Sequence, residues 1–480
     1  MNAVKLSGLQ PAAVFGYFEK ICSIPRGSGN TKAISDYLVS FAVEHGLRYR
    51  QDGLNNVILF ADGTAGYEDH EPVILQGHMD MVCEKDADCA LDMDTQGVDV
   101  THDGKFVFAN GTTLGADNGI AVAYALAILA DKNICRPPME VVITVDEETG
   151  MFGAAGIDLT DLRGRRMLNL DSDAEGVFTV SCAGGSRATI CLPVSRRAVY
   201  GPCVKLTVEG LRGGHSGVEI HKPYANANKI MGELLGRVQQ LMPLCLTKLE
   251  GGAKDNAIPR SCQATLVAMG IGLERINDIT KAMEQEIRDN YDEPDVRIYG
   301  DDVDALGGNA LSTQDTAKVI ALLCGAPNGV QSMSSHIEGL VQTSLNLGVV
   351  TLDENLTMTF AVRSSVNQEK RDLLDRLAEL AKFHDAQYSE TGDYPAWEYR
   401  KDSPLRDSMV AVYEKMYGAS PKVEAIHAGL ECGLLSEKLP GLDCVAMGPT
   451  AYDIHTSRER LDIASTQRVW EFLLELLKTL

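Results

Sequence analysis

Short apolar segments that end in acidic or imidazole side chains constrain this fold more than any other feature. The segment 73–77 is apolar enough for a buried parallel strand, and it leads directly to His78 and Asp80. The segments 141–145 and 167–170 lead to carboxylates in the same way. Because the carboxyl ends of parallel strands meet at one edge of an open α/β sheet, we expect these side chains to lie together. The pattern predicts an α/β fold with a site at that edge.

His78 and Asp80 are two residues apart at the end of an extended segment. Residues at this spacing share a face, so Asp80 can hold the His78 imidazole in the tautomer that binds a metal. A His and an Asp in a solvated loop would give the same pattern. This pair is therefore informative only together with the other clusters.

Asp117 precedes the apolar helical run 120–130 and lies at a predicted helix start. An ordinary N-cap would explain its position equally well. The run Asp146, Glu147 and Glu148 favours a metal site over an ordinary N-cap. Three adjacent carboxylates repel one another unless a cation or a proton compensates their charge. Neighbouring side chains on an extended chain point in opposite directions, so one Glu can bind a metal while the other acts as a general base.

The remaining candidates are Asp171, directly after the strand 167–170, and His455, in a loop after the apolar segment 442–448. Histidines and carboxylates together suit a pair of zinc-like ions that share one bridging carboxylate. Softer metals would favour Cys, and within these clusters only Cys83 lies nearby.

Composition narrows the class of protein. A chain of 480 residues exceeds a single core, so we expect two domains. The formal net charge of −23 argues against nucleic acid or an anionic membrane as a partner. The 12 cysteines form no CxxC pair, the N-terminal segment lacks an apolar signal core, and the run 120–130 is too short to cross a bilayer. These features predict a cytoplasmic protein with reduced thiols.

The order of the candidate residues predicts the domain organisation. His455 comes long after the other clusters, so the intervening chain leaves the catalytic sheet and returns to it. We expect a catalytic domain formed by residues 1–185 and 394–480 and an inserted α+β domain, 186–393. The insertion alternates predicted strands and helices. The expected elements after residue 185 are strands at 204–208, 296–298, 356–362 and 422–426 and helices at 226–240, 276–291 and 368–383, from Pro404 and from Ser465.

Motifs along nearly the whole chain resemble one family. They are LQGHMDMVCEK from Leu75, TTLGADNGIAVA from Thr112, VDEETGMFGA from Val145, LNLDSD from Leu168, GLRGGHSG from Gly210, HAGLECG from His427 and GPTAYDIHTSRE from Gly448. The chain is similar to the aminoacylase and carnosinase superfamily of cocatalytic zinc peptidases, and within it to the aminoacyl-histidine dipeptidases. The resemblance implies an α/β catalytic domain with a mixed, mainly parallel sheet flanked by helices, and an inserted lid domain.

The resemblance also implies roles for the candidate residues. His78, Asp117 and Asp171 would bind one ion, and Asp117, Glu148 and His455 would bind the other. Asp117 would then be the bridge, with a cis peptide bond to Asn118. Asp80 would orient His78, and Glu147 would be the general base. The cofactor implied is a pair of zinc ions, for which manganese or cobalt can substitute.

Residues of the insertion and of the HAGLECG motif would complete the site. By resemblance, His215 in the motif GGHSG stabilises the oxyanion of the tetrahedral intermediate, from its own chain or across a homodimer. Asn256 and Arg363 resemble lid positions that hold substrate, and an arginine would grip a terminal carboxylate. Arg363 could equally form a surface salt bridge. Glu431 could sense the substrate or pair locally.

The function implied is metal-dependent hydrolysis of unblocked dipeptides, favouring a C-terminal histidine as in β-alanyl-histidine, by a water between two metal ions. A tripeptidase or an N-acyl amino acid deacylase of the same superfamily would keep every predicted ligand. A zinc aminopeptidase would share the order of ligands but not the long insertion. A non-catalytic, metal-stabilised scaffold would not need Glu147. The expected partners are small dipeptides, and a homodimer is left open.

Overall fold

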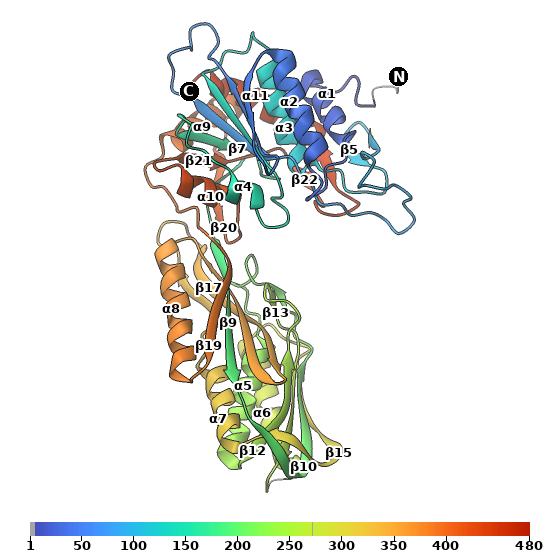
Figure 1. The fold of residues 1–480 in the computed structure, drawn as a ribbon, viewed down its shortest axis with the longest axis vertical. Helices are drawn as coiled ribbons and strands as arrows, with labels where there is room; N and C mark the ends of the chain where they lie inside the picture. Colours follow the sequence, from blue (N-terminus) through green and yellow to red (C-terminus); the bar gives the residue numbers. More distant parts are fainter. Residues whose placement is uncertain (1–4, 271) are drawn as a thin grey trace. The chain divides into compact units, whose positions relative to one another are not determined.

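The computed structural model describes residues 5–270 and 272–480, which divide into two compact units (Figure 1). One unit comprises Met1–Ser181, Tyr399–Ala425 and Leu430–Leu480, and the other comprises Cys182–Glu398 and Ile426–Gly429. The second unit is therefore formed almost entirely by a central stretch of the chain. Among the described residues, no helix combines the length and apolar character that a membrane span needs.

The first unit is built on an eight-stranded mixed sheet with the order β1-β2-β6-β3-β7-β21-β8-β20. Parallel pairing joins the central strands β6, β3, β7 and β21, whereas β1, β2 and β8 pair antiparallel with their neighbours. This confirms the predicted mixed sheet. The elements are α1 (Ala12–Cys22), α2 (Lys32–His45), β1 (Arg48–Gln51), β2 (Val57–Ala61), β3 (Val73–His78), β4 (Val100–His102), β5 (Phe106–Ala109), α3 (Ala116–Ala130), β6 (Met139–Thr144), α4 (Phe152–Gly156), β7 (Arg166–Asn169), β8 (Val177–Cys182), α9 (Pro404–Tyr417), β20 (Lys422–Ile426), α10 (Glu431–Lys438), β21 (Asp443–Ala446), β22 (Ala451–Tyr452), β23 (Arg460–Asp462) and α11 (Ile463–Leu477).

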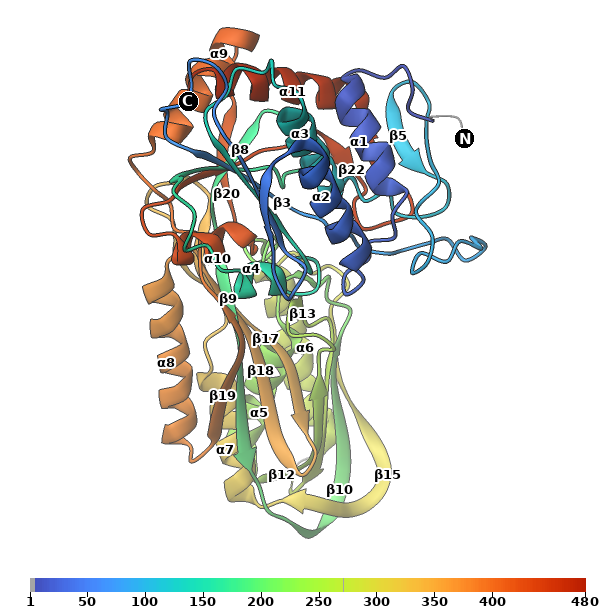
Figure 2. The same cartoon turned by 45° about the horizontal axis from the view of Figure 1, so that its top comes forward.

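The central strands of this sheet are buried along their whole length because helices cover the sheet. Every residue of β3 and β6 is buried, as parallel strands between helical layers require. The helix α3 packs on β3 and on α1 (Figure 2). The ring of its Tyr124 stacks with Trp470 of α11. A small sheet has the order β22-β23-β5-β4, and in it β23, which directly precedes α11, pairs with β5, which leads into the segment before α3.

The second unit is a nine-stranded sheet with the order β15-β10-β14-β12-β17-β18-β9-β19, and β16 pairs with β17. The strand pairs described for it are antiparallel. Its helices pack on the sheet over one continuous apolar core. The elements are β9 (Gly184–Pro193), β10 (Arg196–Glu209), β11 (Gly214–His215), α5 (Ala227–Leu241), β12 (Leu244–Gly251), β13 (Ala257–Ile258), β14 (Cys262–Ala268), α6 (Leu273–Asn290), β15 (Arg297–Leu311), α7 (Thr313–Gly325), β16 (Gly329–Met333), β17 (Val341–Leu352), β18 (Asn355–Ser364), α8 (Asn367–Phe383) and β19 (Gln387–Tyr394).

Candidate metal and catalytic site

Three parallel strands end side by side and place the predicted residues at one edge of the sheet. In the register of β3, His78 lies opposite Thr144 at the end of β6, and Gln76 lies opposite Asn169 at the end of β7. The chain beyond β6 carries Glu147 and Glu148, and the chain beyond β7 carries Asp171. The edge predicted from the sequence is therefore the edge at which these side chains gather.

The buried His78 imidazole contacts carboxylates through both ring nitrogens. Its Nε2 lies 3.1 Å from Asp117 Oδ1 and 3.7 Å from Asp171 Oδ1, and its Nδ1 lies 3.3 Å from Asp80 Oδ1. Asp80 itself is fully buried. The geometry matches an imidazole whose Nδ1 side is held by one carboxylate while Nε2 faces a shared site.

His455 approaches the same site from the other end of the chain. It lies in the loop between β22 and β23, and β23 pairs with β5, which leads into the segment before Asp117. The His455 Nε2 lies 3.1 Å from Asp117 Oδ2 and 3.0 Å from Glu148 Oε1. Asp117 therefore faces one imidazole with each of its oxygens, as expected of a bridging carboxylate.

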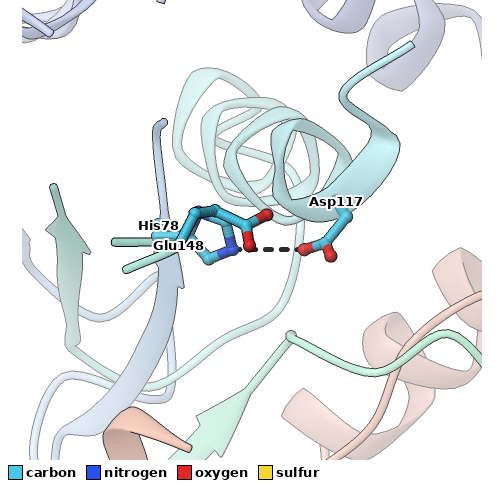
Figure 3. A group of neighbouring side chains, drawn as sticks. All are labelled: His78, Asp117 and Glu148. Atoms are coloured by element: carbon cyan, nitrogen blue, oxygen red, sulfur yellow. Dashed lines mark hydrogen bonds and ion pairs between the residues drawn. The ribbon is translucent and has the colours of Figure 1, made fainter. Parts of the chain in front are cut away.

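The donor atoms have the chemistry and the spacing of metal ligands. Ligand atoms of His78, Asp117 and Glu148 all lie within 4.8 Å of one another (Figure 3). Two ligands at 2.0–2.2 Å from one tetrahedral zinc ion are separated by roughly 3.3 Å, close to the nitrogen–oxygen distances found here. Imidazole and carboxylate donors also suit manganese and cobalt. The residues present therefore fit divalent cations.

Electrostatics favours a cation at this site. Burial, together with the neighbouring carboxylates of Glu431 and Glu148, raises the pKa of Glu147 to about 8, although the charge of His78 acts in the opposite direction. Burial likewise holds the pKa of Asp171 well above its usual range. Hydrogen bonds to Asp117 and Glu148 raise the pKa of His455 to about 10. The site thus holds more carboxylates than its two imidazoles can balance, and bound cations would compensate that charge.

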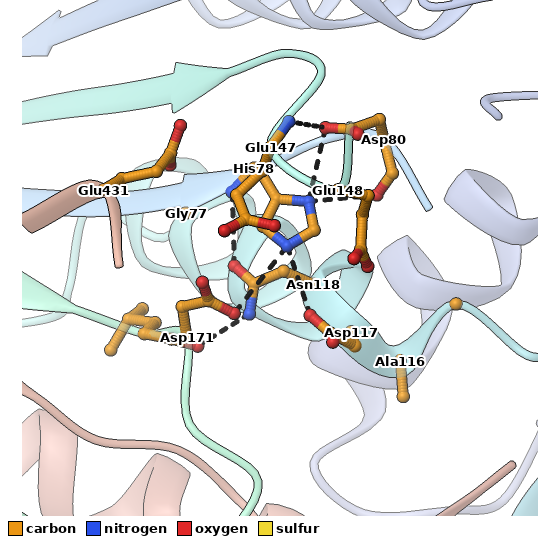
Figure 4. A network of polar contacts seen from close by, with 12 residues as sticks. Gly77, His78, Asp80, Ala116, Asp117, Asn118, Glu147, Glu148, Asp171 and Glu431 are labelled. Carbon is orange, nitrogen blue, oxygen red and sulfur yellow. Dashed lines mark hydrogen bonds and ion pairs between the residues drawn. The ribbon is translucent and has the colours of Figure 1, made fainter. Parts of the chain in front are cut away.

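Asp80 connects the His78 side of the site to the general-base candidate. Its Oδ2 accepts a hydrogen bond from Ser28 Oγ at 2.8 Å. Its Oδ1 accepts one from the Glu147 backbone N–H at 3.2 Å (Figure 4). The orientation of Asp80 is therefore fixed by contacts on both oxygens.

The start of α3 differs from the ordinary helix start that the sequence allowed. Asp117 does not act as the N-cap, because the cap position is Gly115 and Asp117 has non-helical backbone angles. The expected cis peptide bond between Asp117 and Asn118 is present. Asn118 accepts a hydrogen bond from the His78 backbone N–H at 3.2 Å and donates one to the Leu170 carbonyl at 2.9 Å. It thereby ties α3 to the ends of two strands.

Glu431 is fully buried in the same unit, at the start of α10. Its Oε2 accepts hydrogen bonds from Gln76 Nε2 at 2.5 Å and from Thr144 Oγ1 at 2.6 Å. Burial raises its pKa to about 7. The sequence left open whether Glu431 senses the substrate or pairs locally, and its Oε2 pairs locally. Its Oε1 has no hydrogen-bond partner among the described residues.

The second unit carries the other predicted residues. The His215 Nδ1 accepts hydrogen bonds from the backbone N–H groups of Gly217 and Val218 at 3.1 and 3.3 Å, which leaves the proton of the neutral ring on Nε2. Arg363 donates to the Tyr394 hydroxyl at 3.1 Å, a contact different from the surface salt bridge considered above. Asn256 is exposed, and its backbone carbonyl accepts a hydrogen bond from the Ser216 backbone N–H at 2.9 Å.

Two residues that surround the Asp117 segment were missed by the sequence reasoning. Glu459 accepts backbone hydrogen bonds from residues 114–117, and Arg26 donates to the carbonyls of Met79, Asp80 and Gly115. Glu459 lies within the motif that carries His455, so its position was a usable signal. Arg26 gave none, because its partners are backbone atoms that are remote in the sequence.

Comparisons with known proteins agree with this geometry. The chain is 37% identical over 479 residues to the cytosol non-specific dipeptidase of Escherichia coli (strain K12), which covers 99% of each chain. The structure matches the crystal structure of aminoacylhistidine dipeptidase from Vibrio alginolyticus with a TM-score of 0.93 and 37% identity, over 99% of this chain and 98% of that one.

More distant structures share the fold alone. Aminopeptidase PepT from Bacillus cereus matches with a TM-score of 0.56 at 14% identity, over 98% of each chain.

The model of peptidase family M20/M25/M40 matches residues 74–479, a span that contains every predicted site residue. The chain therefore belongs to peptidase family M20/M25/M40.

Proposed function

We propose that this chain is a metal-dependent dipeptidase that hydrolyses unblocked dipeptides, with a preference for a C-terminal histidine. One observation carries the proposal: Asp117 lies between the imidazoles of His78 and His455, with the partly buried Glu147 in the same group of charges. The relatives named above, called a non-specific dipeptidase and an aminoacylhistidine dipeptidase, support the substrate class.

The residues that would hold the cofactor form two overlapping sets. His78, Asp117 and Asp171 would bind one divalent ion, and Asp117, Glu148 and His455 would bind the other. Zinc is proposed for both, with manganese or cobalt as substitutes. When bound, such a pair supplies Lewis acidity towards the peptide carbonyl and lowers the pKa of the attacking water.

Glu147 is proposed as the general base. Its carboxylate would accept a proton from the attacking water and then donate it to the leaving amine, a role for which a pKa raised by burial is suited. Asp80 would hold the Glu147 segment and the His78 imidazole in fixed positions relative to each other, since it contacts both. Each step therefore uses a group whose position is fixed by hydrogen bonds or burial.

Residues 186–393 are proposed as a lid domain that supplies substrate contacts. The Nε2–H of His215 would donate to the developing oxyanion, which fits the tautomer described above. Arg363 would bind the terminal carboxylate of the dipeptide, and Asn256 would contact its backbone.

A cytoplasmic location is proposed from the name of the Escherichia coli relative. Dimerisation stays a prediction.

The experiment that tests the function measures histidine release from Ala-His by chelator-treated protein, before and after addition of zinc, manganese or cobalt. N-acetyl-Ala-His and Ala-Ala-His are assayed beside it. Metal-dependent cleavage of the free dipeptide alone is expected. Preferred cleavage of the acetylated substrate would identify a deacylase, preferred cleavage of the longer peptide a tripeptidase, and no cleavage of any substrate would contradict the proposal.

A further inference from the structure

Four consecutive backbone N–H groups at the start of α3 converge on one buried side chain. The N–H groups of Leu114 and Gly115 donate to Glu459 Oε2 at 2.8 and 2.9 Å. Those of Ala116 and Asp117 donate to Oε1 at 2.8 and 3.3 Å. The start of a helix leaves such groups without partners inside the helix. Here the missing partner comes from a residue remote in the sequence.

The same segment is held from its other side by Arg26, which is 1% exposed. The guanidinium donates to the carbonyl of Gly115 and, through Nη1, to the carbonyls of Met79 at 3.0 Å and Asp80 at 3.2 Å. The peptide groups of Gly115 are therefore fixed through both N–H and C=O. Arg26 also joins this segment to the turn that follows His78.

Gly115 is required where these contacts meet. Its φ of +70° lies in the left-handed region, and a Cβ would lie 2.3 Å from Arg26 Nη2 and 2.7 Å from Met81 Sδ. A side chain at this position would displace the guanidinium. The close packing leaves the segment little room to move relative to Arg26.

We infer that Glu459 is a positioning residue that sets where Asp117 stands between His78 and His455. Glu459 lies four residues after His455 and directly before β23, so one short loop holds both the His455 imidazole and the carboxylate that fixes the backbone of Asp117. Arg26 extends this restraint to the turn of His78 and Asp80. The inference rests on the proposed function, because it assigns Asp117 as the shared ligand.

A purely structural role is the competing explanation, and the chain offers a matched control. Glu140 on β6 is also buried, at 3% exposure against 2% for Glu459, and its carboxylate also accepts backbone N–H groups, from Arg163 at 3.0 and 3.2 Å and from Gly164 at 3.0 Å. The loop it holds carries none of the predicted metal ligands. Glu140→Gln therefore reports the cost of disturbing a buried carboxylate without touching the site.

The test titrates metal-free Glu459→Gln, Glu140→Gln and the parent protein with Zn²⁺ by calorimetry and with Co²⁺ by visible absorption. We expect Glu459→Gln to bind metal about 10–100-fold more weakly, as loss of a residue that orients a ligand does, and to change the cobalt spectrum. Glu140→Gln should match the parent in both readouts, even if both variants unfold at a lower temperature. At saturating metal, Glu459→Gln should lower kcat for Ala-His with little change in KM.

Glu459→Asp keeps the carboxylate and should recover part of the metal affinity; it also serves if Glu459→Gln does not fold. Parent-like metal affinity and cobalt spectrum in the folded Glu459 variants would overturn the inference, as would an equal loss in Glu140→Gln. The metal titration is independent of turnover. A parent protein that binds metal but cleaves no dipeptide would thus contradict the proposed function. The metal titrations of the Glu459 variants would still test the positioning role.

Discussion

Asp80 Oδ1 accepts a hydrogen bond from the backbone N–H of Glu147 over 3.2 Å. The same oxygen lies 3.3 Å from His78 Nδ1, so one carboxylate contacts both the proposed metal ligand and the segment of the proposed base. His78 is the last residue of β3, and Asp80 and Glu147 follow the ends of the neighbouring parallel strands β3 and β6, which is why a short contact can couple them. Changes at Asp80 should therefore affect metal binding and proton transfer together.

The adjacent residues Glu147 and Glu148 should separate catalysis from metal binding. Glu147→Gln removes the proposed base but none of the proposed ligands, so kcat for Ala-His should fall about 10²–10⁴-fold with the metal content unchanged. Glu148→Gln should instead lose metal, because its carboxylate faces His455 at 3.0 Å. Turnover and metal content of both variants are measured side by side. Full activity of Glu147→Gln would show that another group is the base.

Asp80→Asn should weaken metal binding about 10–100-fold, because an amide no longer holds His78 as a carboxylate does. Ser28→Ala is the milder comparison variant. It removes only the 2.8 Å hydrogen bond to Asp80 Oδ2 and should weaken metal binding less. Competition with a zinc chelator gives both affinities. The prediction fails if Ser28→Ala weakens binding more than Asp80→Asn.

His215→Ala should lower kcat for Ala-His about 10²–10³-fold, the range seen when one oxyanion donor is removed. The exposed His221 lies in the same segment, and His221→Ala provides the control. Steady-state kinetics at saturating metal separates kcat from KM. A rise in KM with unchanged kcat would assign His215 to substrate binding instead.

His427 should make the stability of the metal-free protein depend on pH. Burial, and then the positive charges of Arg363 and His221, lowers its pKa from 6.5 to about 4. Between these values the unfolded chain binds a proton that the folded chain does not. Stability should therefore decrease as the pH falls from 6.5 towards 4, by up to about 3 kcal/mol.

Urea unfolding of the metal-free protein at about pH 7.5 and about pH 5 measures this dependence. His427→Gln removes the titrating group, while its amide can still bond to Ser344, whose Oγ lies 2.7 Å from His427 Nε2 in the parent. The variant should lose less stability than the parent between the two pH values. An identical loss in both proteins would mean that His427 is not the group responsible.

Local patterns were enough to predict the central strands β3, β6, β7 and β21 of the sheet in the first unit, whereas β1, β2 and β8 were not predicted. Buried strands with apolar side chains on both faces, such as β3 and β6, produce continuous apolar segments, and a helix as apolar as α3 is visible in the same way. The second unit was harder. The strands β9, β12, β14, β16, β17 and β19 were not predicted, because in antiparallel sheets the pairing partner, rather than the local pattern, decides which residues are buried.

The sequence by itself determined which imidazole and carboxylate side chains are available as the proposed metal ligands, and their places directly after buried strands predicted that they gather at the edge of a parallel sheet. Only the tertiary structure decided that Asp117 stands between His78 and His455, because the pairing of β5 with β23 joins distant parts of the chain. It also decided the places of Glu459 and Arg26, whose partners are backbone N–H and C=O groups. Every residue carries such groups, so no side-chain pattern in a sequence can identify them as partners.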